Sequence, residues 1–377
     1  LSHADAWVRQ WTVRLLGDRR QVSAPVGSAI GDLARRETDP VVLVQLAASA
    51  RRLPSDVGLP VASQLMQKKL PAADPRLPLM IWWALEEHVA EDRQEVLELF
   101  DTNSPLWKTS DGLRCGLLLV RRLAAEGTRS GYDSCVTLLA SVPQRSRGEA
   151  DRRLAQGLEE RANGLTGLGT GGLFNRFGTS EASALKRRTR RFDELTPGLA
   201  DHIRKRWEAG RDNTFWSDLA MRCRITGSHR YARTRVADAG LPAATRARWL
   251  RLLRQYGDAD VLPLGVKYFR AGEPLEVLAQ AMEVLGRFGK QQDLGLIVAD
   301  YPKLAGSLRP RARQLAFGHP QTALAMLELV DRGQVKAKTI DVVELRSLAL
   351  HKDPRLVNLI KKHWGRITAG TAEEKLA

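Results

Sequence analysis

The sequence has few aromatic residues and no long apolar run. Phe, Trp and Tyr make up only 6% of the 377 residues. Because large sandwiches and barrels depend on aromatic and β-branched side chains, this shortage excludes an all-β architecture. The longest strongly apolar stretch, Leu77 to Leu85, is far shorter than the ~20 residues of a membrane span. We therefore expect no transmembrane segment, while a hydrophobic content of 43% suffices for a folded core.

Residues with reactive or metal-binding side chains are sparse and scattered. The three cysteines, Cys115, Cys135 and Cys223, form no CxxC, no zinc spacing and no disulfide framework, so we expect buried core residues. The seven histidines contain no HExxH motif and no HxxxH pair, and there is no GxSxG elbow. The sequence therefore predicts no catalytic, cofactor or metal site in this region. The histidines are His3, His88, His202, His229, His319, His351 and His363.

The sequence has fewer acidic than basic residues. It contains 43 Asp and Glu against 59 Lys and Arg, which gives a formal net charge of +16. Such a field favours phosphates, acidic proteins or anionic membrane surfaces. Arg supplies 45 of the 59 cations, a skew that GC-rich coding also produces, so both interpretations stay open. The densest cluster is our candidate surface for an anionic partner, with a solvated helix face as the alternative. It consists of Lys186, Arg187, Arg188, Arg190 and Arg191.

Helical periodicity dominates most of the chain. One stripe joins Leu43, Leu46, Ala47, Ala50 and Leu53 at the spacing of a single helix face, and residues 278–288 repeat it. No segment alternates apolar and polar residues for long enough to predict a strand. Glycines that follow such stripes are expected to close helices in the left-handed conformation. They are Gly17, Gly257, Gly289, Gly318, Gly333 and Gly365.

Helix starts recur along the sequence. Asp39, Asp74 and Asp353 each precede a proline, which fits a capping carboxylate before the first helical position. If Asp5, Asp39, Asp74 and Asp111 are equivalent starts, the steps are 34, 35 and 37 residues. This period is typical of paired-helix repeats, and we expect roughly eight to ten irregular pairs. The predicted fold is all-α, an α-α superhelix, with repeats in 1–144 and 236–377. Residues 145–235 are expected to be an irregular Gly-rich and basic insertion or connecting helices.

Three local patterns require comment. Gly167 to Gly172 matches GxGxxG, but a dinucleotide site needs a strand before the glycines, and Ala150 to Ala162 is expected to be a helix. A flexible connector is the favoured interpretation. The doublets Glu86-Glu87 and Glu159-Glu160 are adjacent on their helices, so their carboxylates diverge and share no site. The pair Trp82-Trp83 is expected to pack in the core, although only one of the two can face it fully.

A resemblance adds to this interpretation. The opening His3 to Gly17 resembles the second helix of a HEAT repeat, with a capping Asp5 and a closing Leu16-Gly17. Segments 44–54 and 79–86 and the closing His363-Trp364-Gly365 look like the helical region of large bacterial membrane-bound dehydrogenases. The resemblance covers residues 1–90 and 363–377. It implies a HEAT- or armadillo-like solenoid, preceded in that family by a sugar-dehydrogenase-like propeller and followed by a c-type cytochrome domain.

The resemblance implies a function without catalysis in this region. The chain has no CxxCH, so it attaches no haem c itself, and haem c is expected only in a longer parent chain, a dehydrogenase of the periplasm or cell envelope. Our leading hypothesis is a solenoid scaffold that spaces a dehydrogenase domain from a cytochrome domain, with those domains or another protein as partners. The alternative is a nucleic-acid-binding HEAT-like protein of the DNA-repair glycosylase type with a basic concave surface. A third hypothesis is a nucleotide-dependent oxidoreductase built on Gly167 to Gly172.

Overall fold

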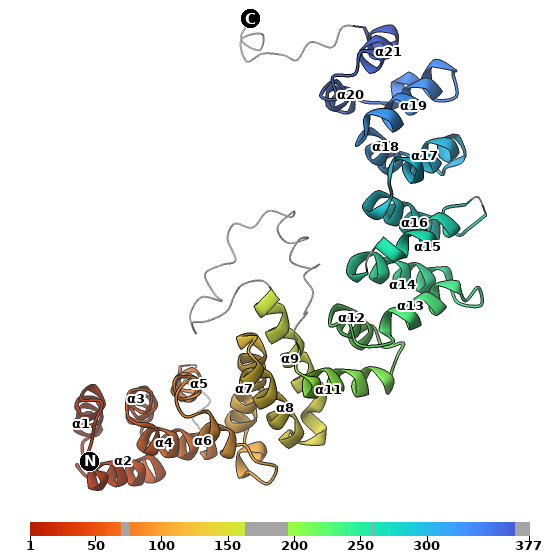
Figure 1. The fold of residues 1–377 in the computed structure, drawn as a ribbon. Coiled ribbons are helices and arrows are strands. Elements are labelled where there is room, and N and C mark those ends of the chain that lie inside the picture. Colours follow the sequence, from red (N-terminus) through yellow and green to blue (C-terminus); the bar gives the residue numbers. More distant parts are fainter. Residues whose placement is uncertain (69–75, 163–194, 258, 271, 366–377) are drawn as a thin grey trace, which may run out of the picture. The chain divides into compact units, whose positions relative to one another are not determined.

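The computed structural model describes residues 1–68, 76–162, 195–257, 259–270 and 272–365. Every regular element in these ranges is a helix, and none of them contains a β-strand. The prediction of an all-α fold is confirmed. Contacts divide the chain into two compact units, Leu1–Ile225 and Thr226–Ala377. Figure 1 labels the helices of both units.

The first unit begins with a series of helix pairs and ends at α12. Its α-helices are α1 (Ala6–Asp18), α2 (Ala24–Arg36), α3 (Pro40–Ala50), α4 (Ser55–Gln67), α5 (Leu77–His88), α6 (Arg93–Glu98), α7 (Ser110–Glu126), α8 (Arg129–Ser141), α9 (Arg147–Ala162), α11 (Pro197–Glu208) and α12 (Thr214–Arg222). The short 3-10 helices η1 (Pro105–Lys108) and η2 (Gln144–Ser146) precede α7 and α9.

The second unit also consists of short helices. Its α-helices are α13 (Ser228–Ala237), α14 (Ala243–Tyr256), α15 (Leu262–Tyr268), α16 (Leu275–Phe288), α17 (Gln291–Asp300), α18 (Arg309–Phe317), α19 (Pro320–Asp331), α20 (Val342–Ala349) and α21 (Pro354–Trp364). Three 3-10 helices, η3 (Ala259–Val261), η4 (Tyr301–Lys303) and η5 (Ala337–Thr339), connect them.

Within the first unit, most helices of the row from α1 to α9 pack against the next helix but one. Helix α1 contacts α3, α3 contacts α5, α5 contacts α7 and α7 contacts α9, while α2 contacts α4 (Figure 1). The apolar stripe predicted from residue 43 to residue 53 lies on α3 and just beyond it. Its side chains are almost fully buried: Leu43, Leu46, Ala47, Ala50 and Leu53. The core is therefore a continuous apolar layer sealed between neighbouring helices.

The second unit has a core of the same kind. Helix α14 packs on α16, α17 on α19, α19 on α21 and α18 on α20. Trp249 of α14, Leu285 of α16 and Met326 of α19 are at most 1% exposed. Among the described residues, the strong contacts of each helix are with near neighbours in sequence.

The aspartate caps predicted at three helix starts are confirmed, and a helix also begins near Asp111, although Asp111 does not cap it. Asp5, Asp39 and Asp353 each accept the backbone N–H two residues ahead, at the starts of α1, α3 and α21. Asp111 is not a cap, because Thr109 Oγ1 takes that role for α7 and accepts from Gly112 N at 3.2 Å. Asp111 thus lies in the first turn, and Asp74 falls outside the described residues.

The expected left-handed glycines are mostly absent from the helix ends that the structure describes. Gly333 does adopt the conformation, with φ 73°, and Gly365 has a positive φ of 79° but an extended ψ of −158°. Gly257 and Gly289 have negative φ, and a Cβ there would lie 2.3 and 2.4 Å from the carbonyl oxygens of Leu253 and Leu285. Close approach, rather than handedness, explains glycine at these two positions. Gly17 lies inside α1 and Gly318 is right-handed.

Candidate functional site

The basic cluster predicted as an anionic-partner surface lies outside the described residues. This holds for Lys186, Arg187, Arg188, Arg190 and Arg191, and equally for the glycines from 167 to 172. Residues 150–162 do form the expected helix, as the greater part of α9. The described ranges also contain no strand from which a parallel sheet could be built. The hypothesis of a nucleotide-dependent oxidoreductase therefore loses the structural context it requires.

The cysteines are buried, as predicted. Burial raises the pKa of the Cys115 and Cys135 thiols to about 12 and raises that of Cys223 as well. Thiolates, the nucleophilic form of cysteine, are therefore disfavoured at all three positions. Within the described residues, no group of three His, Cys, Asp or Glu side chains is arranged to hold a metal ion.

One buried carboxylate gathers basic groups around a small hollow. Asp151 of α9 has only 4% of its side chain exposed and accepts hydrogen bonds from Arg206 and His202 of α11, the latter at 3.3 Å. These three side chains, with Lys205 and Arg147, line a hollow of about 300 Å³ between α8, α9 and α11. The lining contains no hydroxyl or thiol that could act as a nucleophile. The pairing of Asp151 with Arg206 and His202 ties α11 to α9.

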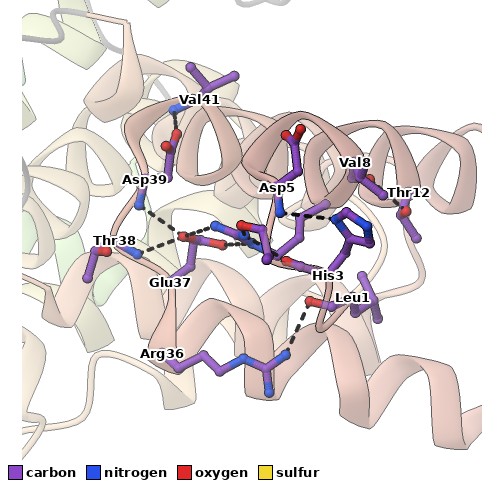
Figure 2. A network of polar contacts seen from close by, with 12 residues as sticks. Leu1, His3, Asp5, Val8, Thr12, Arg36, Glu37, Thr38, Asp39 and Val41 are labelled. Atoms are coloured by element: carbon purple, nitrogen blue, oxygen red, sulfur yellow. Dashed lines mark hydrogen bonds and ion pairs between the residues drawn. The ribbon is translucent and has the colours of Figure 1, made fainter.

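A second buried carboxylate joins the first three helices (Figure 2). Glu37 follows α2, and its side chain accepts two hydrogen bonds from Arg9 of α1, at 2.7 and 3.0 Å. The backbone N–H groups of Thr38 and Asp39 donate to the same carboxylate, each at 3.0 Å. Burial alone would raise the pKa of Glu37, but the hydrogen bonds from Arg9 and from this turn outweigh it and lower the pKa to about 2. The charged form is therefore fixed at the turn before α3.

Charged doublets at the ends of four helices form the most regular feature of the first unit. Arg51-Arg52 follows α3, Glu86-Glu87 lies in the last turn of α5, and Arg121-Arg122 and Glu159-Glu160 lie near the ends of α7 and α9. From one doublet to the next the steps are 35, 35 and 38 residues. We call this set the charge ladder. Its ion pairs are Arg52–Asp18 (3.2 Å), Arg51–Glu87 (2.9 Å), Arg122–Glu86 (3.4 Å), Arg121–Glu160 (2.6 Å) and Arg222–Glu159 (2.7 Å).

The charge ladder follows one rule. The first residue of each doublet pairs with the helix that follows in the row, and the second pairs with the helix that precedes it, as Arg51 and Arg52 show with Glu87 and Asp18. Basic and acidic doublets alternate. Most of these side chains are partly exposed, so each pair contributes at most about 1 kcal/mol, and the ladder's main effect is to specify which helix end lies beside which. At Glu86, burial raises the pKa more strongly than the nearby arginines lower it.

Sequence reasoning found half of the charge ladder. The carboxylates of Glu86-Glu87 and of Glu159-Glu160 were predicted to diverge, and they do, since each doublet reaches two different helices. The arginine doublets at 51–52 and 121–122 were missed. Their recurrence in step with the glutamate doublets is the signal that could have revealed them. Trp82 and Trp83, expected in the core, are both half-buried.

The second unit contains a helix pair with no acidic residue. Helices α13 and α14 together carry seven arginines and neither Asp nor Glu. Four of the arginines pair with carboxylates outside these two helices, for example Arg246 with Glu273 at 3.3 Å and Arg254 with Glu283 at 3.9 Å. Arg230 and Arg251 are exposed and form no ion pair with any residue that the structure describes. This pair of helices is therefore a local excess of positive charge.

Comparison with known protein families, with curated proteins and with solved structures finds no match to this chain. Of the helices that the structure describes, none combines the length and the apolar character needed to cross a bilayer.

Proposed function

We propose that this chain is a non-catalytic α-solenoid, a scaffold of stacked helix pairs. The observation that carries the proposal is the charge ladder, in which doublets spaced by 35, 35 and 38 residues connect successive helices by one rule. A regular ladder of this kind favours equivalent repeats stacked side by side. The packing of α1 on α3, α3 on α5 and α5 on α7 supports the same architecture.

Within that role, we propose that the array separates a dehydrogenase domain from a c-type cytochrome domain in a longer polypeptide of the periplasm or cell envelope. The support is the resemblance of residues 1–90 and 363–377 to the helical region of large bacterial membrane-bound dehydrogenases. A solenoid suits this task because its length and stiffness hold two redox modules at a fixed separation. The partners are then the neighbouring domains, and the haem belongs to the cytochrome domain.

The scaffold proposal predicts that the helices of the first unit keep a fixed distance from one another, and this distance can be measured. Spin labels on Ser28→Cys in α2 and Thr137→Cys in α8, both at exposed positions of the first unit, report one distance by pulsed electron resonance. A stacked array gives a single narrow distance distribution. The three native thiols stay unlabelled because burial suppresses their thiolate form, and a chain without the two added cysteines is the control. A distribution as broad as that of the urea-unfolded chain would refute the proposal.

The spacer role has its own test in the longer polypeptide. Replacing residues 1–377 by a Gly/Ser linker of similar reach should slow electron delivery from the dehydrogenase domain to the cytochrome, because the two modules lose their fixed orientation. Stopped-flow reduction of the haem measures this rate. If the linker chain delivers electrons as fast as the native array, the spacer role is wrong while the solenoid architecture is unaffected.

Nucleic acid is the second candidate partner, and the acid-free pair α13 and α14 favours it. Duplex DNA binding is measured by fluorescence anisotropy across a salt series. If phosphates contact Arg230 and Arg251, Arg230→Gln and Arg251→Gln each lower the slope of log affinity against log salt by about one. Arg204→Gln, on α11, is the control, since Arg204 already pairs with Asp201 and Glu208. Unchanged slopes would remove these helices as a nucleic-acid surface.

A further inference from the structure

A cluster of guanidinium groups spans three helices of the second unit. Glu283 of α16 accepts two hydrogen bonds from Arg311 of α18, at 2.6 and 2.9 Å. Arg254 of α14 approaches the same carboxylate, with its Nη1 atom 3.9 Å from Oε2 of Glu283. Arg251 lies three residues before Arg254 and therefore on the same side of α14. Three arginines thus gather around one carboxylate.

Arg254 lacks the close partner that a half-buried cation needs. Only 27% of its side chain is exposed, and its buried Nε has no hydrogen-bond partner among the described residues. The 3.9 Å contact with Glu283 is longer than a hydrogen bond, and both oxygens of that carboxylate already accept from Arg311. Burial and the positive charges of Arg311 and Arg251 lower the pKa of Arg254, and the attraction of Glu283 does not offset them. An anion beside Arg254 would supply the missing negative charge.

The charges of this cluster do not balance. Arg251 is exposed and unpaired, and within the described ranges the other two arginines pair with no carboxylate except Glu283. The cluster therefore carries a surplus of two positive charges. Free phosphate or a phosphate monoester carries about two negative charges near neutral pH, and its oxygens match the fork of a guanidinium. Since each phosphate of a nucleic-acid backbone carries a single charge, the surplus favours the dianion.

We propose that Arg251, Arg254 and Arg311 form a binding site for a phosphate dianion, either free phosphate or the terminal group of a small phosphate monoester. The dianion accepts hydrogen bonds from the exposed parts of these side chains, of which Arg254 is the most recessed. The two hydrogen bonds between Glu283 and Arg311 hold that guanidinium in place. The inference goes beyond the scaffold role, and its failure leaves that role intact, because the stacking of the helices does not depend on a bound anion.

The test compares a phosphate monoester with a diester of similar shape. Phenyl phosphate is the dianion and methyl phenyl phosphate is the monoanion at about pH 7.5. Calorimetry in a phosphate-free buffer of low salt concentration measures the binding of each to the full chain. Phenyl phosphate should bind about five- to tenfold more tightly, because its second charge meets a second unbalanced cation. Inorganic phosphate should displace it. Comparable affinities would assign the site to the free ion, and a tighter phenyl phosphate would assign it to an ester.

Three variants assign the binding to these side chains. Arg254→Gln should weaken phenyl phosphate binding about tenfold, and Arg251→Gln, at an exposed position, should weaken it about threefold. Both should also narrow the preference for the dianion, because each lowers the surplus to a single charge. Arg332→Gln is the control and should change neither quantity, since Arg332 is exposed and already pairs with Glu328 at 3.1 Å. Arg251→Gln alters no buried group, so it remains decisive even if Arg254→Gln unfolds the chain.

Several results would overturn the proposal. Phenyl phosphate affinity that is the same in Arg251→Gln and Arg254→Gln as in Arg332→Gln would show that these guanidiniums do not hold the anion. Equal affinity for the monoester and the diester would show that the surplus charge selects nothing. Duplex DNA that binds through the same arginines, while phenyl phosphate does not bind, would assign them to a phosphodiester backbone instead.

Discussion

Glu37 shows how much a single buried charge depends on its surroundings. Its carboxylate has four hydrogen bonds, two from Arg9 and one each from the N–H groups of Thr38 and Asp39, and its side chain is only 4% exposed. The sequence shows a glutamate before a capping Asp39 but not that a guanidinium from position 9 reaches it. That partner is set by the packing of α1 over the turn before α3, which no local pattern specifies.

The free energy of unfolding should depend on pH through the titration of Glu37. Its pKa is lowered to about 2, so its contribution is complete above the unfolded-state pKa of about 4.3 and is lost as the pH falls toward 2. Glu37→Gln should therefore be about 2–3 kcal/mol less stable than wild type at pH 7, with the gap closing below about pH 4. Urea unfolding from pH 7 to pH 2.5 measures the gap. Glu87→Gln, at a half-exposed position, is the control, and a gap independent of pH would contradict the assignment.

Gly58 of α4 is required by close packing. A Cβ at this position would lie 2.4 Å from the Ala50 carbonyl oxygen and 2.6 Å from Nε2 of the buried His88, which hydrogen-bonds that same oxygen at 3.0 Å. Gly58→Ala should cost about 1–3 kcal/mol, because backbone and imidazole must shift. Gly31→Ala in α2, where nothing lies within 4 Å, should instead stabilise the chain by up to about 1 kcal/mol. Thermal unfolding of both variants tests this, and equal effects would disprove the packing argument.

At the scale of helices, the apolar periodicity and the aspartate caps were predicted better than the glycines at helix ends. The apolar stripe of α3 and the caps at Asp5, Asp39 and Asp353 follow from local sequence, because each depends on residues within one or two turns. The capping residue of α7 does not, since Thr109 and Asp111 are both of a type that caps helices and the structure uses Thr109. Which helix ends meet is a further step, decided by pairs such as Arg121 with Glu160.

Charge exchange should show that the ladder acts between helices. Arg121→Glu places a carboxylate beside Glu160, and Glu160→Arg places a guanidinium beside Arg121, so each should destabilise the first unit by about 1 kcal/mol. The double exchange should recover most of the loss. Denaturant unfolding of the four proteins gives the coupling energy. Arg129→Glu, at an 86% exposed position, should change stability by less than about 0.5 kcal/mol, and simple addition of the two losses would refute the pairing.

At the scale of the whole chain, two compact units meet between Ile225 and Thr226. This boundary could not be predicted from composition, because the segment around it is helical on both sides, with α12 before it and α13 after it. The division depends on which neighbouring helices pack together and which do not, and this is decided by contacts between helices rather than by the pattern within any one helix.

The three cysteines all belong to the first unit, so thiol labelling reports on that unit alone. Leu285→Ala in α16 should destabilise the second unit by about 2–5 kcal/mol, because a fully buried side chain is removed, yet leave the labelling rates of Cys115 and Cys135 unchanged. Leu46→Ala in α3 should accelerate both rates. Reaction with a disulfide reagent followed by mass spectrometry measures them. Equal acceleration by both variants would mean that the units open together.

The alternation of sign in the charge ladder constrains how such an array can grow or shrink. Excising the repeat that holds Glu86 and Glu87 would leave Arg51 facing Arg122, two like charges in one contact. Excising two consecutive repeats would instead bring Arg51 to Glu160 and preserve every attraction. If the array is built of equivalent repeats, as proposed, removing an even number of them keeps opposite charges in contact, whereas removing an odd number places like charges together at the junction.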